Sequence, residues 1–329
     1  MMEVASRAIE DASPASPVIS FEQAVKDYGQ KKIGPVDLVI EKGEVMGFLG
    51  PNGSGKTTCI RLMLGLIRSS SGKVRINGFD PISSHTQALA SVAYSPELPN
   101  LQTFLTPKEL LSLVLHELVM SFSSVEREKE IYRVLELVGI REYADTKIGK
   151  LSKGMVQRLS VAQALIGEPE LLILDEPMIG LDPAGAAHFR EIFREFARDG
   201  GGTVFMSSHI MSEVESLCSS VAIIHSGKIM IRGSLDEVIK KALDYSIVVL
   251  EAEGLGPSVA EKIRQLDGVV EIIPKNKGLE ITVRGGTDIR PSLSQLVVSS
   301  GAKLYTIKQA DNLLERAYIQ TLNGKGASD

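Results

Sequence analysis

The chain has 329 residues, 43% of them hydrophobic and 23% charged, which is enough for one large globular domain and a smaller one. The formal net charge of −5 at pH 7 argues against a general nucleic-acid binder, because such a protein needs a basic face to displace counterions from phosphates. The two cysteines, Cys59 and Cys218, form no disulfide framework, and we expect both to be free, buried thiols in a reducing compartment.

Residues 1–17 are rich in alanine, serine and proline, and they are predicted to form a disordered leader. Short apolar runs begin at Val18, and strands are predicted at Val36–Ile40 and Val45–Leu49. A glycine-rich segment follows the second strand. After it we expect a helix at 58–67 and strands at 74–76 and 91–94.

The segment GPNGSGKTT at Gly50–Thr58 matches the phosphate-binding pattern G-x-x-x-x-G-K-[ST] between a predicted strand and a predicted helix. Its glycines let consecutive backbone N–H groups point inward, and the helix N-terminus adds partial positive charge. Lys56 is expected to reach the β- and γ-phosphates, and the Thr57 hydroxyl is expected to bind Mg²⁺. The residues predicted to bind ATP here are Gly50, Pro51, Asn52, Gly53, Ser54, Gly55, Lys56, Thr57 and Thr58.

Between Pro107 and Gly149 the apolar residues recur with the period of a helix, which predicts a helical insert. The apolar stretch Leu110–Met120 is interrupted by His116 and Glu117, and it is shorter than the ~20 residues that a membrane span needs. Strand patterns return at 171–174, 203–206 and 221–224, with a helix near 185–198. This alternation predicts a mostly parallel sheet.

Two adjacent carboxylates, Asp175 and Glu176, follow the apolar strand at 171–174. We expect them at the carboxyl edge of the sheet, where α/β proteins bind ligands. Asp175 suits a direct or indirect Mg²⁺ ligand, and Glu176 can face the γ-phosphate and activate water as a general base. The alternative is an exposed acidic turn.

Past about Lys240 the pattern of strands and helices restarts. The predicted order is β-α-β-β-α-β, which is the order of a split βαβ, ferredoxin-like module. A last helix is expected near 312–322.

The segment LSKGMVQRL at Leu151–Leu159 lies between the two phosphate-site motifs, and with them the chain resembles the nucleotide-binding subunits of ABC transporters. The C-terminal module, by its pattern and position, resembles the small extra domain of ATPases that serve ABC-2-type exporters. The first resemblance covers about Val18–Val238. It implies that Tyr28 stacks on adenine and that His209 senses the γ-phosphate and acts with Glu176 and Lys56 in catalysis. It also implies that a partner subunit's nucleotide is contacted by Ser152, Lys153, Gly154 and Asp182.

The chain departs from the family pattern in three places. Glu97 stands where the family has a glutamine beside the metal, so a carboxylate is expected there as a Mg²⁺ ligand. Lys153 replaces the first glycine of the signature motif, and Met155 replaces its polar fifth residue. Ser152 and Gly154 remain, and Ser152 also suits the N-cap of a helix whose free N-terminus can hold an anion.

The resemblance implies an α/β fold, namely a P-loop NTPase ABC ATPase domain with a helical subdomain, plus a small C-terminal α+β (ferredoxin-like) domain. The expected domains are an ATP-binding domain at 18–240, with its helical subdomain at about 98–157, and an accessory domain at 241–329. The subdomain is expected to dock on a permease through Leu98–Leu105.

The implied function is ATP hydrolysis, with Mg²⁺, by a subunit that pairs head to tail with a second copy or with a related ATPase subunit. It would be a peripheral subunit at the cytoplasmic face of the cell membrane, where it would drive a separate integral-membrane permease. It would bind no nucleic acid. Two alternatives stay open. One is a non-transport ABC ATPase that acts as an ATP-gated interaction switch, and the other is a hydrolysis-dead binding module, against which Glu176 and His209 argue.

Overall fold

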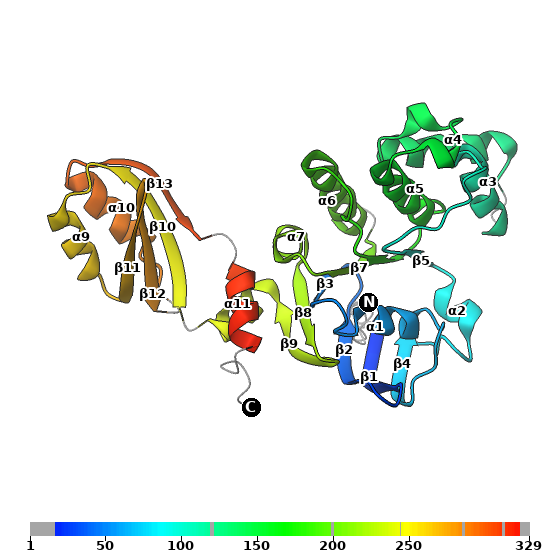
Figure 1. The fold of residues 1–329 in the computed structure, drawn as a ribbon, viewed down its shortest axis with the longest axis horizontal. Helices are drawn as coiled ribbons and strands as arrows, with labels where there is room; N and C mark the ends of the chain where they lie inside the picture. Colours follow the sequence, from blue (N-terminus) through cyan, green and yellow to red (C-terminus); the bar gives the residue numbers. More distant parts are fainter. Residues whose placement is uncertain are drawn as a thin grey trace, which may run out of the picture. The chain divides into compact units, whose positions relative to one another are not determined.

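The computed structural model describes residues 17–118, 122–198, 201–243, 245–284, 287–310 and 313–322. The predicted leader therefore lies outside the described residues, apart from Pro17. Contacts within the chain separate two compact units, residues 1–229 and residues 230–329 (Figure 1). Each unit has its own hydrophobic core.

A six-stranded sheet forms the centre of the first unit, and its last strand, β9, continues past Ile229, the last residue of that unit. The strand order of the sheet is β5-β6-β7-β3-β8-β9, and the pairs that join β5, β6, β7, β3 and β8 are parallel, as predicted. Every residue of β3, β6 and β7 is buried, so both faces of these strands are covered, and each strand contains a hydrophobic run, although β6 and β7 end in polar residues. The six strands are β5 (Val92–Ser95), β6 (Leu171–Asp175), β7 (Thr203–Ser208), β3 (Val45–Leu49), β8 (Ser220–His225) and β9 (Lys228–Ser234).

A second, antiparallel sheet of order β2-β1-β4 accompanies the parallel one. Its strands are β1 (Ile19–Asp27), β2 (Lys32–Ile40) and β4 (Ser71–Ile76). The predicted strands at 36–40 and 74–76 belong to this sheet and not to the parallel one. The connection between β1 and β2 is too short for a crossover, so the two strands pair as a hairpin.

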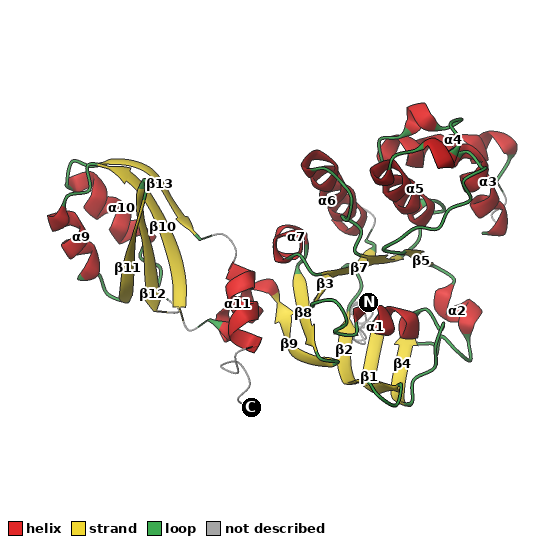
Figure 2. Ribbon diagram, viewed as in Figure 1, coloured by secondary structure: helices red, strands yellow, loops and turns green. Residues whose placement is uncertain are grey.

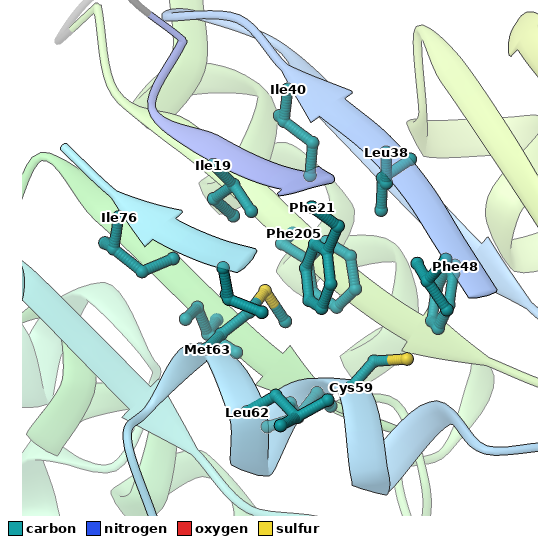
Figure 3. Close-up of a cluster of buried hydrophobic side chains, with 14 of the residues drawn as sticks. Ile19, Phe21, Leu38, Ile40, Phe48, Cys59, Leu62, Met63, Ile76 and Phe205 are labelled. Carbon is teal, nitrogen blue, oxygen red and sulfur yellow. The ribbon is translucent and has the colours of Figure 1, made fainter. Parts of the chain in front are cut away.

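The main hydrophobic core of this unit lies between the antiparallel sheet, helix α1 (Lys56–Met63) and the central parallel strands. Figure 3 shows side chains from all of these elements gathered together, among them Phe21, Met63 and Phe205. The rings of Phe48 and Phe205 are 5.3 Å apart between centroids, a favourable aromatic distance. Because α1 packs on the sheet from its first turn, the loop that joins β3 to α1 is held at both ends.

The predicted helical insert is confirmed as α3 (Pro107–Glu117), α4 (Ser124–Leu137) and two short 3-10 turns, Arg141–Tyr143 and Ile148–Lys150, which lead into α5 (Lys153–Leu165). Figure 1 shows α3, α4 and α5 grouped together near β5. The remaining helices of this unit are α2 (His85–Leu89), α6 (Pro183–Arg198) and α7 (Met211–Leu217). Of the helices described, none has the length and apolar character that crossing a membrane requires.

The second unit contains an antiparallel sheet of order β11-β12-β10-β13 with helices α9 and α10 packed against it (Figure 2). This order, and the succession β-α-β-β-α-β along the chain, are those of the predicted ferredoxin-like module. The elements are β10 (Tyr245–Glu253), α9 (Pro257–Arg264), β11 (Val269–Lys275), β12 (Gly278–Arg284), α10 (Arg290–Ser299) and β13 (Lys303–Gln309).

Two further helices, α8 (Leu235–Ala242) and α11 (Leu313–Leu322), contact each other within the second unit. Ala242 of α8 and Ala317 of α11 share a small apolar cluster with Ile247 of β10. The separation between the units, after Ile229, therefore precedes the domain boundary expected after residue 240. The assignment of the two units to an ATP-binding domain and an accessory domain remains a prediction.

Candidate active site

The carboxyl ends of β3, β6 and β7 meet at one edge of the parallel sheet. Leu49 at the end of β3 is level with Ser208 of β7, and Asp175 at the end of β6 is level with Ser207. The segments that follow these strands carry the predicted phosphate loop, the predicted general base and His209. The sheet topology thus gathers residues that are more than 100 positions apart in the sequence.

The phosphate loop joins β3 to α1, and its glycines are required by its geometry. Gly55 has a φ of 119°, a conformation that favours glycine, and a Cβ on Gly50 would clash with the carbonyl oxygen of Ile224. Helix α1 begins directly after Gly55, with no side-chain cap and no acidic residue in its first turn. Its first N–H groups and its partial positive charge are therefore available to an anion.

Lys56, Glu176 and His209 form one cluster at this edge. The Lys56 ammonium donates to the Gly50 carbonyl at 2.7 Å and lies 3.2 Å from Glu176 Oε1. Nδ1 of His209 lies 2.9 Å from the other oxygen, Glu176 Oε2. Lys56 and Glu176 are both buried, whereas the His209 side chain is 40% exposed. The structure therefore brings together the three residues predicted to act in catalysis.

Two buried oxygens at the site lack a hydrogen-bond partner among the described residues, namely Ser54 Oγ and Glu176 Oε1. The contact of Glu176 Oε1 with Lys56 is an ion pair by distance, but it does not have hydrogen-bond geometry. Buried polar atoms without partners are rare and call for an explanation such as a bound ligand or water. Both atoms lie where the sequence predicts phosphate and attacking water.

The Asp175 carboxylate is 3% exposed, and the Ser207 hydroxyl donates to its Oδ1. Burial, together with repulsion by the Glu176 carboxylate, raises the pKa of Asp175 above its ordinary value, although hydrogen bonds from Ser207 and Thr57 and the attraction of Lys56 lower it. A hydroxyl and a carboxylate, Thr57 and Asp175, are the hard oxygen donors that suit Mg²⁺. The residues at the site therefore fit the predicted ion.

The backbone of Glu176 is in the left-handed region, with a φ of 51°. Its N–H donates both to the Ser207 hydroxyl at 3.1 Å and to the Ser207 carbonyl at 3.2 Å. Such strain in a non-glycine residue persists only where the surroundings hold it, and it is concentrated at functional sites.

Two predicted site residues lie apart from this cluster. Tyr28, after β1, is 49% exposed, and its ring lies 5.5 Å from the Lys26 ammonium. Glu97, after β5, is exposed. In the part of the chain that the structure describes, no hydrogen bond or ion pair joins either residue to Lys56, Glu176 or His209. The exposed ring of Tyr28 is free to stack on a planar ligand.

The signature segment lies on the surface at the start of α5. Ser152 caps this helix, as predicted, because its hydroxyl accepts from the backbone N–H of Met155 at 3.3 Å. Gly154 is close to the loop after Glu176, since a Cβ on Gly154 would lie 3.1 Å from the Gly180 carbonyl oxygen. In the same loop the Asp182 carboxylate accepts from Gly185 N at the start of α6. The predicted partner-contacting residues, Ser152, Lys153, Gly154 and Asp182, thus lie together.

Sequence reasoning missed two buried residues that connect these parts. Gln157 of α5 donates to the Pro177 carbonyl at 3.2 Å, which ties the signature helix to the chain directly after Glu176. Ser207 bonds to both Asp175 and Glu176. Ser207 lies in a strand in which every residue is buried, so the apolar pattern could not single it out. Its position two residues before His209 was the one available signal.

A phosphate loop at a helix N-terminus, with two carboxylates at the end of a parallel strand one position beyond the neighbouring strand, defines a P-loop nucleotide hydrolase. The family model described as ABC transporter matches residues 33–179. The chain is 33% identical over 310 residues to the bacitracin transport ATP-binding protein BcrA of Bacillus licheniformis, covering 94% of this chain and 98% of that protein. It is 30% identical to the linearmycin resistance ATP-binding protein LnrL of Bacillus subtilis, covering 95% of this chain and 100% of that protein.

Solved structures agree with these relatives. A structure described as the ATP binding subunit of an ABC transporter has a TM-score of 0.63 and 29% identity, and the match covers 68% of this chain and 92% of that one. The chain belongs to the ABC transporter family, as an ATP-binding subunit that hydrolyses ATP.

Proposed function

We propose that this ATPase drives an exporter from the cytoplasmic face of the cell membrane, by closing on ATP as a head-to-tail dimer that acts on a separate permease. The export direction is supported by the two relatives whose names refer to antibiotic transport and resistance. The observation that supports the dimer is that the predicted ATP-contacting residues lie at two different places in the unit, one buried and one exposed. Lys56 and Glu176 are buried at the sheet edge, while Ser152 faces solvent at the start of α5.

In this proposal each ATP lies between the phosphate loop of one subunit and Ser152, Lys153 and Gly154 of the other. The free N-terminus of α5 then binds the γ-phosphate from the opposite side. Asp182 lies beside this segment and contacts the partner. The exposed Tyr28 ring stacks on adenine, and the other loop residues direct their backbone N–H groups at the phosphates.

Hydrolysis needs the Lys56 ammonium to leave the Gly50 carbonyl and Glu176 and to bind the phosphates. The freed Glu176 carboxylate accepts a proton from the water that attacks the γ-phosphorus. His209, next to Glu176 Oε2, holds the carboxylate and contacts the γ-phosphate. Thr57 and Asp175 would hold Mg²⁺, with Glu97 as a further ligand that the family resemblance implies, and the ion would supply positive charge to the phosphate oxygens.

The energy of this switch comes from ATP, which binds the closed dimer more tightly than the open one. A shift from 1:99 to 99:1 needs ~5.5 kcal/mol of differential binding. Two bridged nucleotides, each held by charge-assisted hydrogen bonds of about 1.5–3 kcal/mol apiece, supply energy of this size. Loss of the γ-phosphate removes those bonds and reopens the pair.

Docking on a permease is assigned to the helical subdomain at about 98–157. Two large apolar side chains in its leading segment, Leu98 and Phe104, are exposed. Side chains of this kind in solvent are consistent with a surface that another protein covers.

Three variants test this function. Lys56→Ala should abolish ATP binding or turnover, and Glu176→Gln should bind ATP, lose turnover and elute as a dimer in size-exclusion chromatography with ATP. Adding Ser152→Glu to Glu176→Gln should prevent the dimer, because a carboxylate then faces the γ-phosphate. The control is Ser292→Glu, an exposed serine at the start of α10. Wild-type turnover by Glu176→Gln, or an unchanged dimer with Ser152→Glu, would contradict the proposal.

A further inference from the structure

Ser207, at the end of β7, is completely buried and makes two hydrogen bonds with its one hydroxyl. The hydroxyl donates its proton to Asp175 Oδ1, and it accepts the backbone N–H of Glu176 at 3.1 Å. These are the two residues that the proposed function uses as metal ligand and general base.

The geometry of this contact follows from the sheet. Asp175 and Ser207 are directly paired across the parallel strands β6 and β7. At this position a short hydroxyl side chain, which is both a donor and an acceptor, can reach the Asp175 carboxylate and the backbone N–H of Glu176 at the same time. Because all three residues are buried, solvent does not compete for these bonds.

The hydrogen bond to Oδ1 restricts the rotation of the Asp175 carboxyl group and therefore the directions from which it can coordinate an ion. Partners of this kind orient a ligand without touching the metal, and their loss typically lowers metal affinity by about 10–100-fold. The Ser207 hydroxyl and the Ser207 carbonyl both accept from Glu176 N, and together they hold the strained backbone, with its φ of 51°, from which the general base projects.

We propose that Ser207 is a positioning residue that sets the orientation of the Asp175 carboxylate for Mg²⁺ and fixes the backbone of Glu176. The inference rests on the proposed role of this site. Ser207 acts on the metal-dependent part of nucleotide binding, and the contacts of the phosphate loop with the phosphates do not require it.

A matched control is available in the same unit. Ser160 of α5 is also buried, and its hydroxyl is hydrogen-bonded to the Ser95 hydroxyl at 2.8 Å. Ser160→Ala therefore removes one buried hydroxyl, as Ser207→Ala does, but it breaks a single hydrogen bond and touches neither carboxylate. A loss of function that comes only from reduced stability would appear in both variants.

The experiment measures the affinity of the full chain for ADP by calorimetry, once in EDTA and once in excess Mg²⁺. The dissociation constant in EDTA divided by the dissociation constant in Mg²⁺ measures how much the metal strengthens ADP binding. This ratio needs no turnover. Ser207→Ala should reduce this ratio tenfold or more, within the 10–100-fold range of such partners, while the affinity in EDTA stays unchanged. Ser207→Thr, which keeps the hydroxyl, should retain the ratio, and so should Ser160→Ala.

A wild-type ratio in Ser207→Ala would overturn the inference and leave the proposed function intact. A wild-type chain that does not bind ADP, or whose affinity does not respond to Mg²⁺, would instead overturn the proposed site. If Ser207→Ala does not fold, Ser207→Cys decides, since it keeps a similar volume with a much weaker donor. A Cys variant with the wild-type ratio would also overturn the inference.

Discussion

At the scale of single residues, the site keeps its charges buried and paired with one another. The Lys56 ammonium lies against Glu176 in a part of the chain from which water is largely excluded. Breaking such a pair by removing one partner leaves an uncompensated charge, which is destabilising. In the proposed cycle the phosphates replace Glu176 as the partner of Lys56, so the charge stays compensated when the general base is released.

The two thiols give a prediction at this scale. Burial raises the pKa of Cys59 to about 12 and raises the pKa of Cys218 further, so both stay neutral at any physiological pH. Because the thiolate is the reactive form, neither should be alkylated by iodoacetamide in the folded chain at pH 8. Mass spectrometry after labelling checks this, with chain unfolded in guanidinium as the positive control. Rapid labelling of Cys59 in the folded chain would contradict the burial described here.

At the scale of elements, helices α3 and α4 both begin with a capping box. In α4 the Ser123 hydroxyl accepts from Glu126 N, and the Glu126 carboxylate accepts from Ser123 N at 2.8 Å. The corresponding residues in α3 are Thr106 and Glu109. These reciprocal bonds satisfy N–H groups that have no partner within the helix, and they fix where each helix starts.

The capping box of α4 gives a pH prediction. The hydrogen bond from Ser123 N lowers the pKa of Glu126 below its ordinary value of 4.5. The folded state therefore favours the carboxylate, and the contribution is present above the unfolded pKa and lost as the pH falls through the folded one. Glu126→Gln should lower the melting temperature at neutral pH, and the difference from wild type should shrink in acid.

The control for this prediction is Glu22→Gln, at an exposed position of β1. The difference in melting temperature between Glu22→Gln and wild type should not shrink in acid in the same way. If the melting temperatures of Glu126→Gln and wild type differ by the same amount at neutral and acidic pH, the charge of Glu126 does not contribute to stability through the cap.

At the scale of the whole molecule, the two units have separate hydrophobic clusters. The core of the first unit includes Leu171, and the core of the second includes Leu250, which is fully buried between β10 and its helices. All residues of the candidate active site lie in the first unit. The second unit is thus expected to be dispensable for nucleotide binding itself.

A pair of matched substitutions tests this separation. Leu250→Ala should cost about 2–5 kcal/mol of stability, as buried leucine-to-alanine changes do, and leave the affinity for ADP unchanged. Leu171→Ala removes the same atoms from the other core and should weaken ADP binding as well. Thermal unfolding and ADP titration of both variants provide the measurement. An equal loss of ADP affinity in both would mean that the units stabilise each other.

The sequence by itself determined the features that depend on neighbours along the chain. The phosphate loop, the buried strand before Asp175 and Glu176, the cap at Ser152 and the β-α-β-β-α-β order of the second unit are all encoded within short segments. Their residue types and spacing restrict the backbone locally, so a pattern indicates them directly.

Only the tertiary structure decided which distant segments lie together. The antiparallel pairing of β1, β2 and β4, the contact of α8 with α11 and the bonds of Ser207 and Gln157 all join separated parts of the chain. In a fully buried strand every position is equally protected, so a hydroxyl that orients a carboxylate looks like any other core residue in the sequence. Its role follows from the register of two parallel strands, which long-range packing sets.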